Sequence, residues 1–162
     1  KPDLSKLAIG DYIIKLSVQD NPKIPPAMWS ADYALNLTVV TDLKLTATLS
    51  PNPSKQGGKV TFRINTIGYA DYLTLYFPTE IAKLDPLVPI SKAIVREYDH
   101  LEMVEYYLPL ATPLTLDDNG NRLRAPYNID IRADKTDGTF RIVTLELDVQ
   151  GSILNGIKTE IR

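Results

Sequence analysis

The sequence predicts an all-β protein built as an antiparallel β-sandwich. Apolar and polar side chains alternate with a period of two along most of the 162 residues, which is the pattern of strands with one buried face. Clusters of Pro, Gly, Asn and Asp separate the alternating runs, as turns between antiparallel strands require. We expect eight strands, at residues 12–18, 35–39, 43–49, 60–64, 73–77, 104–110, 127–133 and 140–149.

Two segments depart from this alternation. Apolar residues recur at helical spacings from Ile90 to Leu108, which predicts either a short helix over residues 91–99 or an irregular connection. In the last expected strand, the parity of the apolar residues changes between Ile142 and Val143. We expect a β-bulge at this point, because one extra residue would absorb the slip.

The beginning of the chain resembles the end of the predicted sandwich. Tyr12 and Tyr127 each begin a run in which every second residue is apolar, and each run leads through a polar loop into a closing strand with the pattern Leu-x-Leu-x-Val. Self-similarity of this kind indicates repeated modules. Residues 10–41 are then the last two strands of one module, and residues 142–150 end a second copy. A single sandwich that takes its first strands from residues 1–42 is the alternative.

These patterns divide the chain at Thr41–Asp42. Residues 1–42 are expected to form the closing β-hairpin of a preceding module, or the first strands of the same sandwich. Residues 43–150 form the sandwich itself. Residues 151–162 are a C-terminal segment or linker, whose apolar residues recur every three or four positions. That spacing predicts a short helix, which either lies on the sandwich or bridges to a further module.

Several runs resemble modules of one kind. Thr-Leu-Ser-Pro-Asn-Pro-Ser (48–54) and Gly-Gly-Lys-Val-Thr-Phe (57–62) are similar to the opening of bacterial surface immunoglobulin-like modules. The closing strands of PKD-like modules are similar to Gly-Asp-Tyr-Ile-Ile-Lys-Leu-Ser-Val-Gln-Asp (10–20). Residues 107–113 and 127–131 agree with the same resemblance. The resemblance implies an immunoglobulin-like antiparallel β-sandwich. The cysteine and tryptophan pattern of antibody domains is absent from the sequence.

Two tyrosines occupy positions that fit this resemblance. In immunoglobulin-like sandwiches, a Tyr near the start of the penultimate strand turns back and bonds an upstream backbone group. Tyr12 and Tyr127 each open such a strand. Simple packing of either ring is the alternative interpretation.

The resemblance also implies a function. Modules of this kind are non-catalytic spacers or interaction units of multi-domain bacterial proteins that are secreted or attached to the cell surface, where they serve in adhesion. The expected location is therefore extracellular. The expected partners are the neighbouring modules of the same protein, with another protein or a glycan as further candidates.

Composition excludes several classes of function. The chain has 18 Lys and Arg against 20 Asp and Glu, and this near balance argues against a nucleic-acid partner. Cysteine is absent, which rules out disulfides, cysteine-ligated zinc and thiol nucleophiles. No run of roughly 20 apolar residues occurs, so we expect no direct insertion into a membrane. We read the chain as a piece of a longer protein, with any signal peptide or anchor outside it.

The sequence predicts no enzyme, and no catalytic, cofactor-binding or metal-binding residue. The single histidine, His100, lies among acidic and polar residues without a nucleophile motif nearby, so we expect a surface side chain. Glu102 and Glu105 would point to opposite faces of a strand and cannot converge on a substrate. The run Asp117–Asn121 has oxygen ligands at alternate positions, as a calcium loop would, but it also fits an ordinary turn, which we favour.

Aromatic residues offer the remaining candidate contacts. Trp29, the only tryptophan, follows two prolines and Met28 in a loop. If exposed, it would serve a carbohydrate-binding module as a platform for sugar rings, or anchor a protein partner. Otherwise it packs at the junction between the hairpin and the sandwich, which is the interpretation we favour. Tyr69, Tyr72 and Tyr76 form a second aromatic set, for which we expect packing within the sheet.

Overall fold

The computed structural model describes residues 7, 10–18, 32–39 and 42–151. The chain divides into two compact units, Lys1–Thr41 and Asp42–Arg162. Trp29 and residues 152–162, for which the sequence suggested a ligand contact and a helix, lie outside the described residues. Within the described part of the chain, no helix has the length and apolar character needed to cross a bilayer.

The first unit contains a β-hairpin. Strand β1 (Gly10–Leu16) pairs antiparallel with strand β2 (Tyr33–Val39), and Tyr12 lies opposite Leu37. Residues directly opposite each other in an antiparallel pair point to the same face. One face of the hairpin is therefore apolar throughout and carries Tyr12, Ile14, Leu16, Tyr33, Leu35 and Leu37. We call these six residues the hairpin apolar face.

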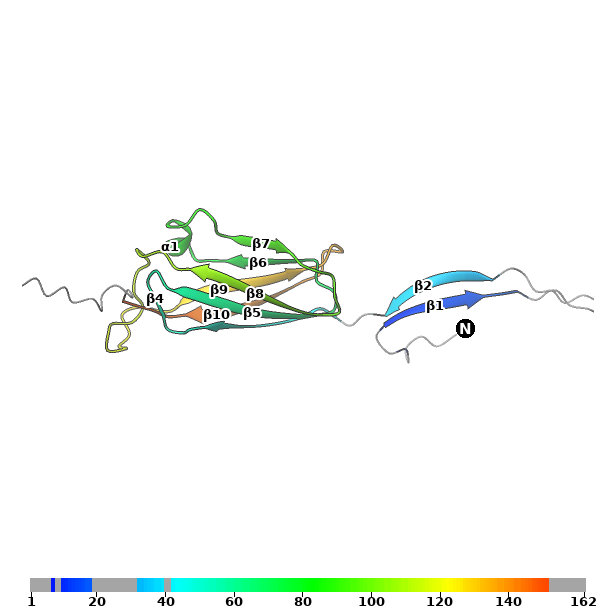
Figure 1. Cartoon of the computed structure of the whole chain (residues 1–162), viewed down its shortest axis with the longest axis horizontal. Coiled ribbons are helices and arrows are strands. Elements are labelled where there is room, and N and C mark those ends of the chain that lie inside the picture. The colour runs from blue at the N-terminus through cyan, green and yellow to red at the C-terminus, as the bar shows by residue number, and fades with distance from the viewer. Residues whose placement is uncertain (1–6, 8–9, 19–31, 40–41, 152–162) are drawn as a thin grey trace, which may run out of the picture. The chain divides into compact units, whose positions relative to one another are not determined.

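The second unit consists of two antiparallel sheets packed as a sandwich (Figure 1). One sheet has the order β3-β5-β8, with β3 at Lys44–Ser50, β5 at Lys59–Ile67 and β8 at Asp99–Tyr107. The other has the order β10-β9-β6-β7, with β6 at Tyr72–Tyr76, β7 at Ile90–Ala93, β9 at Tyr127–Asp134 and β10 at Phe140–Leu147. A short helix, α1 (Thr79–Ala82), follows β6.

A short parallel pair joins the two edges of the sandwich. Strand β4 (Ser54–Lys55) pairs with strand β11 (Val149–Gln150). The Asn52 side chain, in the turn before β4, donates to the Glu146 carbonyl at 3.0 Å and accepts the Asp148 N–H at 2.8 Å. These contacts fix the end of the last strand against the turn that follows the first strand of the sandwich.

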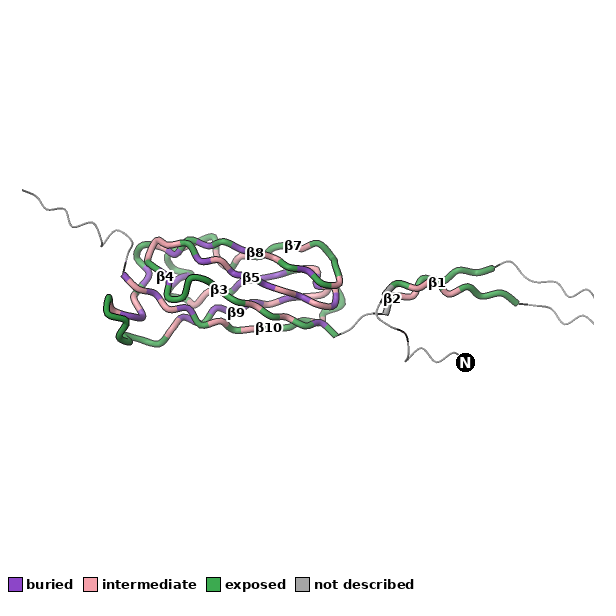
Figure 2. The backbone as a smooth tube through the Cα atoms, turned by 60° about the horizontal axis from the view of Figure 1, so that its bottom comes forward, coloured by how far each residue is buried: buried purple, intermediate pink, exposed green. Residues whose placement is uncertain are grey.

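One hydrophobic core fills the space between the two sheets. Along β5, every second residue from Val60 to Thr66 is buried, and the same alternation runs along β9 (Figure 2). The Phe77 ring lies 6.0 Å from the Phe62 ring and 4.4 Å from the Tyr106 ring, measured between centroids. Each such side chain contributes about 1.5–3 kcal/mol when it is buried. The observed strands and their alternating burial thus confirm the all-β prediction for this unit.

Of the two alternatives for residues 91–99, the helix is wrong and the irregular connection holds for part of the segment. Residues Ile90–Ala93 form the edge strand β7, which pairs with β6, and residues 94–98 form an irregular connection. The β-branched Ile90, Ile94 and Val95 favour an extended backbone. Pairing with β6 satisfies that backbone, and the Ile94 N–H continues the contact by donating to the Asp71 carbonyl at 3.0 Å.

The expected β-bulge between Ile142 and Val143 is also absent. The pairing of β10 with β9 runs without a slip, from Phe140 opposite Asp134 to Leu147 opposite Tyr127. The apolar parity changes because Phe140 and Ile142 point away from the core and stay exposed. The guanidinium of Arg132 lies 4.2 Å from the centroid of the Phe140 ring and partly covers it.

Candidate functional site

A group of titratable side chains lies where β7 and β8 face each other at the edge of the sandwich. His100 and Glu102 share the core side of β8 with Val104 and Tyr106, because side chains alternate along a strand. The His100 side chain is 11% exposed. The sequence-based prediction of a surface histidine is therefore wrong, and the parity of Val104 and Tyr106 would have placed it correctly.

His100 and Glu102 contact each other, and two further charged groups, Glu97 and Lys92, contact the pair. His100 Nε2 lies 2.9 Å from Glu102 Oε2, and His100 Nδ1 lies 3.5 Å from Glu97 Oε2. Lys92, on β7, donates to the other carboxylate oxygen of Glu102. Burial by itself would raise the pKa of Glu102, but the hydrogen bonds from Lys92 and His100 outweigh it and hold the pKa below its ordinary value. Glu102 is thus ionised at neutral pH and links the two sheets.

This cluster fits the closing of a sheet edge better than it fits catalysis. Charged side chains that point inward are a known means of protecting an edge strand from further pairing. Glu105 points to the opposite face of β8, as expected, and pairs there with Lys59 at 2.7 Å. Among the described residues, no group of three or more His, Asp or Glu side chains is arranged to hold a metal ion.

The acidic run at residues 117–121 forms a turn, as we favoured. Asp117 Oδ1 accepts the backbone N–H groups of Asn119 at 2.9 Å and Asn121 at 2.8 Å, and Oδ2 accepts the side-chain amide of Asn121 at 2.9 Å. These bonds, led by the Asn121 amide, hold the pKa of Asp117 below its ordinary value. Gly120 has φ +81°, which a glycine adopts without strain. Both carboxylate oxygens of Asp117 therefore serve the turn.

Of the two interpretations of Tyr127, the structure shows the upstream backbone contact. Its hydroxyl donates to the Pro113 carbonyl at 2.8 Å, and its side chain is buried at the start of β9. Burial raises the pKa of this hydroxyl, which keeps it protonated and able to donate. The loop that leads into β9 is fixed further at Thr115, whose hydroxyl donates to Asp148 Oδ1 at 2.8 Å and accepts the Val149 N–H at 2.8 Å.

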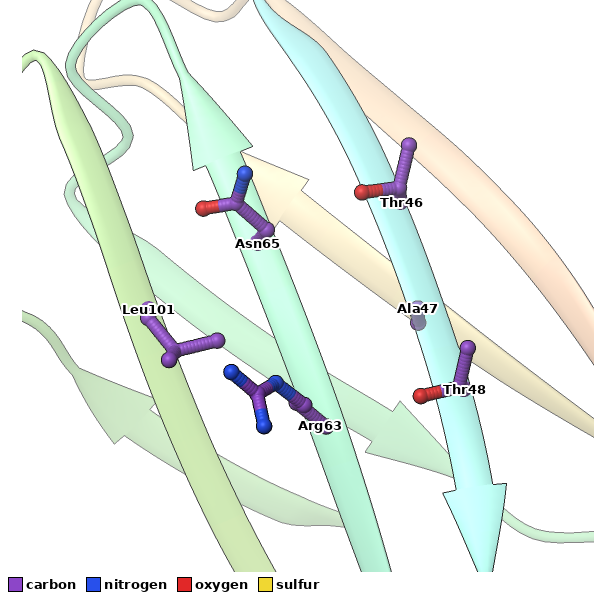
Figure 3. Close-up of a pocket in the computed structure, with 6 residues that line it drawn as sticks. All are labelled: Thr46, Ala47, Thr48, Arg63, Asn65 and Leu101. Atoms are coloured by element: carbon purple, nitrogen blue, oxygen red, sulfur yellow. The ribbon is translucent and has the colours of Figure 1, made fainter.

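The outer face of the sheet β3-β5-β8 carries an exposed mixed surface. The outer side of β8 carries Leu101, Met103, Glu105 and Tyr107 in turn, and all four are exposed. Beside them is a shallow depression of about 170 Å³, lined by Thr46, Ala47, Thr48, Arg63, Asn65 and Leu101 (Figure 3). We call these residues except Ala47, which packs against the core, together with Met103, Glu105 and Tyr107, the β8 outer surface. Sequence reasoning missed it, although its members on β8 have the parity opposite to that of the buried Val104 and Tyr106.

The other aromatic candidates are separated from one another. Tyr72 and Tyr76 lie on the outer side of β6, and both are exposed rather than packed. Tyr69 lies in the turn before β6 and contacts Tyr98 edge to face, with 5.6 Å between ring centroids. The set therefore does not pack together within the sheet as we expected.

Comparisons of the chain with protein-family models, with curated proteins and with solved structures find no match. Function must therefore be inferred from the contacts described above. The structural features that bear on function are the closed apolar core, the charged pair of edge strands, the fixed loop before β9 and the exposed β8 outer surface.

Proposed function

We propose that residues 42–151 form an immunoglobulin-like sandwich that serves as a non-catalytic spacer or interaction module of a multi-domain bacterial protein, secreted or attached to the cell surface. Three features support the immunoglobulin-like type. The sheets have the orders β3-β5-β8 and β10-β9-β6-β7, the edge strands β4 and β11 pair in parallel, and the Tyr127 hydroxyl bonds the Pro113 carbonyl upstream of its strand.

The observation that carries the spacer function is the course of the chain through this unit. The chain enters the sandwich at the start of β3. Strand β4 follows the end of β3, and β11 pairs with β4, so the chain completes the sandwich at the end opposite to the one it entered. Figure 1 shows β4 at one end of the sandwich. A module that the chain enters at one end and leaves at the other adds its full length to a series of modules.

The filled core supports the same function. The buried side chains of both sheets belong to one hydrophobic cluster that includes Phe62, Ile64, Leu75 and Ile131. Close packing of this kind gives a rigid body. The charged residues Lys92 and Glu102 then close the edge between β7 and β8. Rigidity and protected edges are what an extended stalk needs in order to hold its length without aggregating.

A replacement experiment tests the proposal in the natural protein. Residues 42–151 are deleted in one variant and exchanged in another for an unrelated β-sandwich of similar length. A spacer predicts that deletion impairs surface display or adhesion, and that the exchanged module restores it. If the exchanged module fails as completely as the deletion, length is not the property that matters. The β8 outer surface would then be the first candidate for a specific contact.

A further inference from the structure

The two hairpins of this chain correspond residue by residue. The repeated pattern Leu-x-Leu-x-Val aligns Leu37 with Leu147, and the preceding strands align Tyr12 with Tyr127. Both alignments follow from the sequence patterns alone and are independent of the strand pairing. In the structure Tyr12 lies opposite Leu37, and Tyr127 lies opposite Leu147. Sequence alignment and strand register therefore agree.

The agreement extends to the next two cross-strand pairs. Each is apolar, and each points to the same side of its hairpin as the tyrosine. In the first hairpin the pairs are Ile14 with Leu35 and Leu16 with Tyr33; in the second they are Ile129 with Leu145 and Ile131 with Val143. Side chains on the opposite side are mostly polar in both hairpins. The first hairpin thus has the two-sided character of strands that close a sandwich.

The burial of the two apolar faces differs sharply. Tyr127, Ile129 and Ile131 are at most 4% exposed, because the side chains of the sheet β3-β5-β8 cover them. On the hairpin apolar face, Leu16 is 48%, Leu35 is 54% and Tyr33 is 70% exposed, and the other three members are half-buried. A two-stranded hairpin is only marginally stable in water. Its apolar face therefore needs a cover.

We propose that the hairpin apolar face is a docking surface for a three-stranded sheet of the β3-β5-β8 type, contributed by the polypeptide of a preceding module. Such a sheet presents alternating apolar side chains, as β5 does with Val60, Phe62 and Ile64. The hairpin would complete that module, as β9 and β10 complete the second unit. This inference rests on the proposed series of modules, and it names the partner that the first hairpin binds.

A second copy of this chain is a poorer occupant. Its own sheet β3-β5-β8 already covers β9 and β10, and the side chains between them are buried. To bind the first hairpin of another copy, the sheet would have to release its own hairpin and expose that core. A preceding module that uses residues 10–39 as its closing hairpin would carry no such cost.

Hydrogen exchange tests the inference on the full-length natural protein, with the 162-residue chain as reference. We expect the amides of residues 12–16 and 33–37 to exchange roughly a hundredfold more slowly in the full-length protein, because they then open only when a packed module opens. Equal and fast exchange in the two samples would overturn the proposal. Slow exchange in the 162-residue chain that appears only as its concentration rises would assign the surface to a second copy, and would overturn it as well.

Two substitutions on one strand provide the matched control. Leu35→Asp places a charge on the hairpin apolar face, whereas Asn36→Asp places the same charge on the opposite face. In the full-length protein, we expect Leu35→Asp to remove the protection of the hairpin amides and Asn36→Asp to keep it. Equal protection in both variants would contradict the docking surface. Failure of the spacer in the replacement experiment would leave this result unchanged, because the hairpin lies outside the exchanged residues.

Discussion

Strands β5 and β8 are neighbours in one sheet, and their core-facing sides have different chemistry. The core side of β5 carries Val60, Phe62 and Ile64 and only one polar residue, Thr66, which is uncharged. The core side of β8 begins with His100, opposite Thr66, continues with Glu102 and becomes apolar only at Val104. The difference follows from position. β5 has a strand on each side, but β8 lies at an edge of its sheet. A central strand can keep a largely apolar core side, while an edge strand needs charges to limit further pairing.

The largest expected effect is on the central strand. Phe62→Ala should lower the free energy of unfolding by about 3–5 kcal/mol, because the removed ring leaves a cavity that the fully buried surroundings cannot refill. Urea denaturation measures this change. Arg63→Ala, at the next position and on the exposed face, is the control and should change stability by less than about 0.5 kcal/mol. Similar losses in the two variants would contradict the assignment of faces in β5.

A buried polar contact should have a smaller effect than a core ring. Tyr127→Phe removes the hydroxyl that bonds the Pro113 carbonyl and keeps the ring in place. We expect a loss of about 1–2 kcal/mol in the free energy of unfolding, the usual range for one such hydrogen bond and its unsatisfied partner. Tyr107→Phe, on an exposed tyrosine, should change nothing measurable. A neutral Tyr127→Phe would remove the main support for the immunoglobulin-like type.

The ionised Glu102 should make the free energy of unfolding depend on pH. The pKa of folded Glu102 lies below its ordinary value of 4.5, so its ionised form stabilises the fold above that pH. The stabilisation is lost as the pH falls through the lower pKa of the folded state. Glu102→Gln should therefore lower the free energy of unfolding at pH 7 by about 1 kcal/mol, the usual size for one lost hydrogen bond. It should also flatten the loss of stability as the pH falls below 4.5. Glu105→Gln, on the opposite face of the same strand, should keep the native pH profile; identical profiles for both variants would argue against the network.

The smallest effect is expected on the outer side of β8. Met103→Ala shortens an exposed side chain and should alter the free energy of unfolding by less than about 0.5 kcal/mol. Thermal unfolding followed by circular dichroism is sufficient to check this. A large loss would mean that Met103 is covered in solution, and the β8 outer surface would then be an interface rather than a free face.

The sequence predicted the main strands because long runs such as Val60 to Ile64 carry several repeats of the alternation. It did not predict β4 or β11, which are two residues long and too short to show a period. Strand β7 was missed because its partly buried edge position spaces the covered side chains irregularly. Phe140 and Ile142 misled the parity argument, since an apolar residue can remain exposed beside an arginine.

The candidate site was less accessible from sequence. The contact between Lys92 and Glu102 joins strands of different sheets, and no local pattern contains that information. The burial of His100 could have been deduced, because it shares its parity with Val104 and Tyr106. The bond from Tyr127 was anticipated because the position of a tyrosine at the start of a strand is a local feature.

The central claim is that the second unit extends the protein along its length, and one distance tests it directly. The chain has no cysteine, so Lys44→Cys and Glu146→Cys, both at exposed positions near opposite ends of the sandwich, give two unique sites for spin labels. A strand rises about 3.3 Å per residue, which predicts a separation of roughly 20 Å between the labelled backbone positions. Pulsed electron resonance that finds the labels near 20 Å or farther apart agrees with a spacer. A separation of about 10 Å would place both ends of the unit together and contradict it.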